Sequence, residues 1–358
     1  MLGGIDNRNN YMQHFYETGI AQQYALRMNG GTDRMAWLLS IGHDRNKDNL
    51  ASTYQRSTAK LENSWQLLKG LQLSARAMLT HSASKTGKTE YTSLSSGTSQ
   101  LPPYVTFANE QGNALPVMKD YRQKVIDALG TNALLNWDYY PLTDSEHSYI
   151  EQKLLDLLAN ITLNYKLNKN ISATLNYQLQ QQQTDIQRTD DADSYFTRNL
   201  INSFTQLGGG SPKRIVPLGS ILDQTDGKLL AQNLRGQVNY HQEWAKHSVN
   251  LLLGGELLKS NTFNQIRTTY GYNPSILTAV NMDFVNTYPN VLTGRSSFIP
   301  NRNGFSESIR RNVSAFANLA YTYLGRYTLS LSARQDASNL FGVATNDKWN
   351  PLWSGGLA

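Results

Sequence analysis

The strongest constraint on the fold is a strict alternation of apolar and polar residues that recurs in about ten segments of the chain. In residues 326–336, the apolar side chains of Tyr327, Leu329, Leu331 and Ala333 alternate with hydroxyl-bearing and charged residues. A β-strand places successive side chains on opposite faces, so each segment would have one apolar and one polar face. The repeated alternation predicts an all-β protein made of two-faced antiparallel strands.

The segments occur in pairs separated by short turns, most of which contain glycine or asparagine. Such spacing is typical of β-hairpins. The five predicted hairpins pair residues 24–29 with 35–41, 59–67 with 71–79, 159–167 with 171–180, 234–244 with 248–258, and 313–323 with 327–337.

The connections between these hairpins are much longer than the turns within them. They run over residues 42–56, 81–148, 184–232 and 262–311. Structureless loops of this length are uncommon in compact soluble domains. Short turns alternating with long loops are typical of outer-membrane barrels, in which the turns are periplasmic and the loops extracellular. One segment, residues 117–129, has apolar residues at helical spacing and is followed by Gly130, which predicts a short helix within the longest loop.

Together these features predict an antiparallel up-and-down transmembrane β-barrel, present in part as about ten to eleven strands of a larger barrel. A soluble β-sandwich has the same two-residue period and remains the structural alternative. In the barrel, one set of side chains would face lipid: Leu175, Leu251, Leu329 and Leu331. The opposite set would face the lumen: Asn176, Asn250, Ser330 and Arg334.

Composition limits the functional classes. The chain has no cysteine, which excludes disulfides, thiolate metal sites and a cysteine nucleophile. Its net charge of +6 is spread along the sequence rather than gathered in a patch, so we expect no nucleic-acid partner. The six histidines are scattered. Asp190, Asp191 and Asp193 lack the further ligands of a calcium loop, so we expect a solvated acidic turn there. We find no catalytic triad, and we predict a protein that is not an enzyme and that holds no metal or cofactor.

Two stretches resemble the SusC/RagA family of TonB-dependent outer-membrane transporters. Residues 29–42, Asn-Gly-Gly-Thr-Asp-Arg-Met-Ala-Trp-Leu-Leu-Ser-Ile-Gly, are similar to the family's early-barrel hairpin. Residues 334–342, Arg-Gln-Asp-Ala-Ser-Asn-Leu-Phe-Gly, followed by Lys348-Trp349 and 351–354, are similar to its mid-barrel signature, with Ala337 in place of glycine. Residues 136–142 also resemble a loop common in the family.

The resemblance implies active, TonB-dependent import of oligosaccharides or peptides through the outer membrane. It also implies a SusD-like surface lipoprotein as partner and contact with TonB through an N-terminal region. The family's TonB box and plug domain do not appear in the chain, nor does a signal peptide, so we expect residues 1–358 to be an interior portion of the barrel that does not insert stably alone. A passive porin and a soluble glycan-binding module remain as alternative functions.

Aromatic residues in the predicted loops are the candidate contacts for a ligand or partner. They are Trp137, Tyr139, Tyr140, Tyr195, Phe196, Tyr270 and Tyr272. Aromatic rings can stack on sugars or line a peptide groove, although long loops also use them to pack on themselves. We single out Trp137, Asp138 and Tyr139, because an aromatic plane beside a carboxylate can both stack on a sugar and accept its hydrogen bonds.

Overall fold

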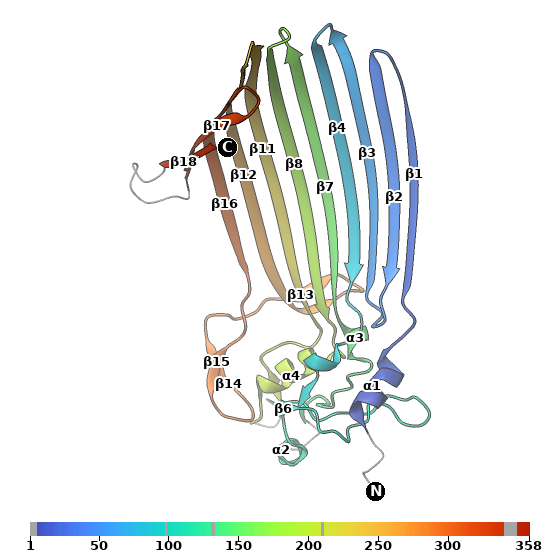
Figure 1. The fold of residues 1–358 in the computed structure, drawn as a ribbon. Helices are drawn as coiled ribbons and strands as arrows, with labels where there is room; N and C mark the ends of the chain where they lie inside the picture. Colours follow the sequence, from blue (N-terminus) through green and yellow to red (C-terminus); the bar gives the residue numbers. More distant parts are fainter. Residues whose placement is uncertain (1–5, 97–98, 130–132, 209–210, 340–348) are drawn as a thin grey trace.

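The computed structural model describes residues 6–96, 99–129, 133–208, 211–339 and 349–358. One large antiparallel sheet dominates, with a head of loops and short helices at one end (Figure 1). Its strands lie side by side in chain order, and the short β13 (Thr278–Val280) pairs with β12. The strands are β1 (Ile20–Thr32), β2 (Met35–Lys47), β3 (Thr53–Leu68), β4 (Leu71–Lys85), β7 (Ser148–Lys166), β8 (Ile171–Asp190), β11 (Ser220–Trp244), β12 (His247–Asn273), β16 (Gly304–Tyr323), β17 (Tyr327–Ser338) and β18 (Trp349–Leu357).

All five predicted hairpins are present, as the pairs β1–β2, β3–β4, β7–β8, β11–β12 and β16–β17. Their turns lie at the end of the sheet opposite the head (Figure 1). The β3–β4 turn shows why one of them needs glycine. Gly70 has a φ of 87°, and a Cβ there would lie 2.6 Å from the carbonyl oxygen of Lys166. This close approach lets the Lys166 amide donate to the Gly70 carbonyl at 2.7 Å, which joins the turn to the next hairpin.

The register confirms the predicted division into two faces. Cross-strand partners lie on the same side of a sheet, and Leu251 pairs with Leu319, which pairs with Leu331. Asn250, one residue away, pairs with Ala320, which pairs with Ser330 on the other side. Exposed aliphatic side chains gather on the leucine face: Leu61, Leu79, Ile161, Leu175, Val238, Leu253, Leu257, Val313, Leu329 and Leu331. The sheet therefore has an apolar outer face and a polar inner face, as a barrel wall requires.

The strands extend further toward the head than predicted, and the connections are correspondingly shorter. The predicted long loop 42–56 is wrong, because only residues 48–52 separate β2 from β3. The three other connections cover residues 86–147, 191–219 and 274–303, not counting the short elements inside them. Polar residues on both faces hide the alternation in these extensions, as in β8, where Gln181, Gln182 and Gln183 follow one another.

The head contains the remaining helices and strands. They are α1 (Asn7–Phe15), η1 (Tyr91–Ser93), β5 (Ser95–Ser96), β6 (Ser99–Gln100), α2 (Gln123–Asp127), α3 (Asp144–His147), α4 (Tyr195–Ser203), β9 (Thr205–Gln206), β10 (Lys213–Arg214), β14 (Thr287–Pro289) and β15 (Ser296–Phe298). Among the described residues, no helix is long and apolar enough to cross a membrane.

The helix predicted over residues 117–129 is confined to α2. Its first residues are not helical, because the amide of Val117 donates to the carbonyl of Tyr139 at 2.7 Å in an isolated β-bridge. The predicted end at Gly130 lies outside the described residues. Burial also differs from that of a single amphipathic helix: Val117 is buried, whereas Met118 and Val125 are exposed.

Two apolar clusters hold the head together. The first combines α1 with distant loop residues and consists of Tyr11, Phe15, Leu94, Phe107, Val117, Trp137, Tyr139 and Tyr195. The second lies around α4 and the loop-side ends of β11 and β12, and consists of Ile201, Phe204, Val216, Ile221, Tyr270 and Ile299. The buried hydrophobic core of the chain is therefore in the head, since the sheet itself has no second layer.

Candidate ligand-binding and partner-binding surfaces

The inner face of the sheet carries a hollow of about 630 Å³ near β1–β4 and β7. Arg27, Arg76 and Glu62 line it. Glu62 Oε1 forms ion pairs with Arg76 Nε at 2.5 Å and with Lys60 Nζ at 2.8 Å. Two cationic side chains therefore share one carboxylate. Beside these charges the wall is neutral and hydrogen-bonding, and it includes Asn29, Ser64, Asn160, Thr162 and Gln178. Its volume lies within the range of small-ligand sites.

A second hollow of about 550 Å³ lies nearer the short turns of β11, β12, β16 and β17. Its inward-facing polar lining consists of neutral side chains: Asn239, His241, Asn250, Asn318, Ser330 and Ser332. His241 Nδ1 lies 2.7 Å from Asn250 Oδ1, so these two side chains brace each other. Amide and hydroxyl groups of this kind can exchange hydrogen bonds with sugar hydroxyls or with peptide groups.

On the head side of the second hollow, Phe316 on β16 packs against Gly254 on β12. Its ring covers the backbone of its cross-strand partner Gly254. The guanidinium carbons of Arg235 and Arg334 lie 4.8 and 5.8 Å from the ring centroid, in cation–π geometry. Arg334 is held there by Asp336, to which its Nε donates at 2.9 Å. The absence of a side chain at Gly254 therefore leaves the space that the Phe316 ring occupies on the inner face of the sheet.

Gly254→Ala should destabilise the full-length barrel by about 1–3 kcal/mol, because a Cβ at this position would lie 2.3 Å from the Phe316 ring. The measurement is urea-induced unfolding in lipid vesicles. Gly255→Ala is the matched control, since its added Cβ would meet nothing closer than the Ser314 carbonyl oxygen at 3.4 Å. Equal stabilities of the two variants would contradict the close packing of Phe316 on Gly254.

The head places Trp137 and Tyr139 inside its first apolar cluster, at 6% and 4% exposure. Trp137 Nε1 donates to Asn199 Oδ1 on α4 at 3.0 Å, and the Tyr139 ring meets the Tyr195 ring at 5.2 Å. Asp138 between them is only partly buried, and Arg198 donates to its carbonyl at 3.0 Å. In this conformation both rings pack within the loop. A ligand-binding role for the three residues stays a prediction.

Of the other loop aromatics, Tyr195 and Tyr270 are also buried, whereas Tyr140, Phe196 and Tyr272 are half-buried. Lys119 joins this group, with its Nζ 3.9 Å from the Tyr139 ring centroid and 4.8 Å from that of Tyr195. Burial lowers the pKa of Lys119 below its ordinary value. Burial, followed by the hydrogen bond that the Tyr195 hydroxyl donates to Asp120 Oδ2, raises the pKa of Tyr195. These contacts hold the loop around residues 117–121 against α4.

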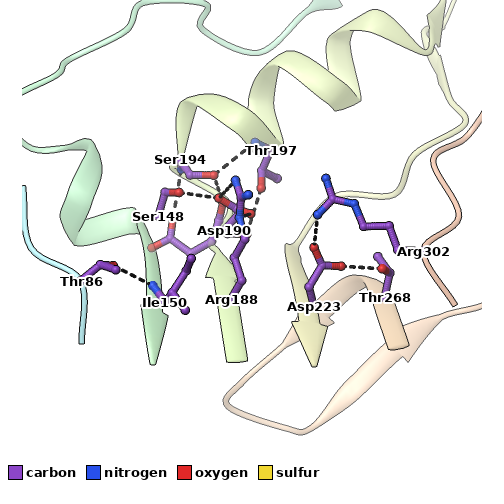
Figure 2. Close-up of polar contacts among 11 residues, drawn as sticks. Thr86, Ser148, Ile150, Arg188, Asp190, Ser194, Thr197, Asp223, Thr268 and Arg302 are labelled. Atoms are coloured by element: carbon purple, nitrogen blue, oxygen red, sulfur yellow. Dashed lines mark hydrogen bonds and ion pairs between the residues drawn. The ribbon is translucent and has the colours of Figure 1, made fainter. Parts of the chain in front are cut away.

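Two carboxylates lie at the head-side ends of the strands (Figure 2). Asp190, only 1% exposed at the end of β8, accepts hydrogen bonds from Arg188 Nε at 2.8 Å and from the Ser148 hydroxyl. Asp223 on β11 accepts from the Thr268 hydroxyl and from Arg302 Nη1 at 2.8 Å. Asp190 is therefore a structural anchor rather than part of a solvated acidic turn, which corrects the expectation from sequence.

The neighbouring residues His147, Asp191 and Asp193 bring potential ligand atoms within 4.8 Å of one another. His147 Nδ1 lies 2.9 Å from Asp191 Oδ2, and Asp191 Oδ1 accepts the amides of Asp193 and Ser194. These bonds form the turn before α4. Since these local contacts already use both oxygens of Asp191 and one nitrogen of His147, the cluster is accounted for by local structure.

No family profile and no curated protein sequence matches the chain. Solved structures do match its fold. The chain is similar over 99% of its length to the RagAB peptide transporter, with a TM-score of 0.72 and 13% identity, and it covers 35% of the matched chain. The RagAB peptide importer in its 'open-open' state matches with a TM-score of 0.71 and 12% identity, again over 99% of this chain and 35% of the other.

The chain thus spans about a third of the length of these neighbours. Within that third, the strand order, the two-faced wall and the loop head agree with the fold expected from the resemblance to SusC/RagA proteins. The part of the second signature between Leu340 and Lys348 lies outside the described residues, whereas Arg334 and Asp336 lie on β17. The chain has the fold of about a third of the matched transporter chain, an open portion of a large antiparallel β-barrel.

Proposed function

We propose that residues 1–358 form part of the barrel domain of a TonB-dependent importer in the outer membrane, and that its substrates are oligosaccharides or peptides. The observation that carries the proposal is the contrast between the two faces of the large sheet. One face exposes a continuous set of aliphatic side chains, the other is polar and hollowed, and a folded head lies at one end. The matched structures are those of a peptide transporter, which supports transport rather than catalysis.

A soluble glycan-binding module is disfavoured by the outer face. Leu175, Leu253 and Leu257 are each about half exposed, at 49%, 48% and 52%. An apolar surface that follows many adjacent strands would cause aggregation in water, whereas lipid would cover it. A passive porin shares this wall, and only its independence from TonB would distinguish it.

The partners that we propose are a SusD-like surface lipoprotein at the head, TonB through an N-terminal region of the longer protein, and the lipid of the outer membrane. Support for a protein partner comes from the connection 274–303. Four of its apolar side chains are 60–82% exposed: Ile276, Leu277, Val285 and Phe298. Exposed apolar side chains on a folded loop are typical of interaction sites.

We also propose that Trp137, Asp138 and Tyr139 serve substrate or lipoprotein binding by shaping the head rather than by stacking on a ligand. Both rings are buried, so the surface available to a ligand at this point is that of Asp138 and its neighbours. A hollow of about 150 Å³ beside it is lined by Lys119, Asp120 and Tyr121, among others.

The test is uptake by cells that carry the full-length gene. We expect its deletion to abolish growth on the cognate oligosaccharide or peptide as sole nutrient, and growth to return with the intact gene. Cells without functional TonB should fail to grow in the same way. Growth on that nutrient without TonB, with uptake that does not saturate, would assign the protein to the passive porins.

A further inference from the structure

On seven strands of the sheet, the outward side chains change from apolar to charged toward the head. On β12 the outward side chains run Val249, Leu251, Leu253, Gly255 and Leu257, and Lys259 follows. This apolar run covers nine residues, whereas β12 has 27. A membrane-spanning strand needs only about 9–11 residues. The charged positions therefore mark the level at which the strands leave the hydrocarbon on the side of the head.

The first formal charge beyond the apolar run is almost always positive. The register identifies the outward residues on each described strand of the main sheet, and seven of these strands carry an outward charge beyond the run. Six of the seven begin with a basic residue, and only β8 begins with an acidic one, Asp185. The six are Arg45 on β2, Lys85 on β4, Lys153 on β7, Lys228 on β11, Lys259 on β12 and Arg311 on β16.

Lys259 and Arg311 are direct cross-strand partners, and both are exposed. Like charges in this position repel each other and destabilise the pair of strands. The ion pairs that the described residues form on this face join Lys47 to Glu17, Lys85 to Glu151 and Arg267 to Asp226. None of them involves Lys228, Lys259 or Arg311. Three basic side chains on three adjacent strands thus lack an anionic partner within the described part of the chain.

We propose that Lys228, Lys259 and Arg311 bind the phosphate groups of a phosphorylated glycolipid in the outer leaflet. The chemistry follows from position and charge. The lipid's acyl chains would lie along Leu257 and its cross-strand partner Val313, directly below the basic pair. Its phosphate would lie between Lys259 and Arg311, where charge-assisted hydrogen bonds to lysine and arginine offset their repulsion. This site is separate from the inner wall and does not depend on which substrate is transported.

The experiment uses the full-length protein, purified in mild detergent and studied by native mass spectrometry with lipid A that carries phosphate. We expect the wild-type protein to retain this lipid. The double variant Lys259→Gln, Arg311→Gln should retain it about 30-fold less, since each basic side chain near an anionic lipid contributes about fivefold. Lipid A treated with phosphatase should bind both proteins equally weakly.

Arg310→Gln with Arg235→Gln is the matched control. It removes two charges from the same region of the sheet, but from the inner face, because Arg310 precedes Arg311 in an alternating strand. This control should retain lipid as the wild type does. Heat-modifiable migration of each variant shows that the barrel is assembled. Equal retention by an assembled double variant, strong binding of the dephosphorylated lipid, or full competition by millimolar inorganic phosphate would each overturn the proposal.

Discussion

Replacing both Trp137 and Tyr139 by alanine in the full-length protein should loosen the head and reduce substrate uptake or lipoprotein association, while the barrel still assembles. Both rings are buried in the cluster that joins the loop to α1 and α4. Removal of a buried aromatic side chain costs about 3–5 kcal/mol, which exceeds what a loop-anchored subdomain can lose without opening. Limited proteolysis between residues 86 and 147 should therefore become faster.

The matched control is the double variant Tyr104→Ala, Met118→Ala. These residues belong to the same connection but are 52% and 53% exposed, so their loss removes little buried surface. We expect this variant to resist protease and to take up substrate as the wild type does. If the Trp137–Tyr139 variant also kept wild-type protection, uptake and association, these two side chains would have no role in the head. If the variant failed to assemble, their role would extend to the barrel.

An arginine at position 251 should destabilise the full-length barrel by about 2–4 kcal/mol, whereas an arginine at position 250 should cost about 1 kcal/mol or less. Leu251 lies on the outer face between Tyr240 and Leu319, at the depth of the hydrocarbon. Asn250 points into the second hollow, where its loss removes one hydrogen bond with His241. The comparison requires reversible folding into lipid vesicles, with the free energy taken from urea titration.

Neighbouring positions provide their own control, because the two variants introduce the same side chain into the same strand. Equal costs would be incompatible with a lipid face and a lumen face. A larger cost at Asn250 would reverse the assignment of the faces, and with it the position of the lipid site at Lys259 and Arg311.

The hairpins could be predicted from sequence because two local signals agree there. Alternation has a period of two only in strands, and the turns between Leu68 and Leu71 or between Tyr323 and Tyr327 carry residues suited to a left-handed backbone. The extensions of the strands toward the head could not be predicted in this way. There, as at Gln181–Gln183, both faces meet water, so burial no longer imposes a pattern.

The head was harder to predict, because its contacts join residues far apart in the chain. Of the residues at helical spacing, Met118 and Tyr121 lie in the loop that follows the bridge between Val117 and Tyr139, whereas Val125 lies in α2. Conversely, α1 was not predicted, although Asp6 caps its N-terminus and Tyr11 and Phe15 lie one helical turn apart. The burial of Trp137 depends on Asn199 and Tyr195, some sixty residues away, so its local sequence could not distinguish a packed ring from an exposed one.

The length of β12 determines how far the wall of the sheet extends beyond the membrane. On β12, the residues from Lys259 to Asn273 continue beyond the apolar run for about 50 Å of strand at roughly 3.3 Å per residue. Even with a tilt of about 45°, this extension would carry the end of β12 some 35 Å above the lipid, whereas β4 ends at its first outward charge, Lys85. In the importer proposed above, the complete barrel would extend this wall around a space outside the membrane. A solute that leaves its first contact there would meet the wall again before it reached the external medium.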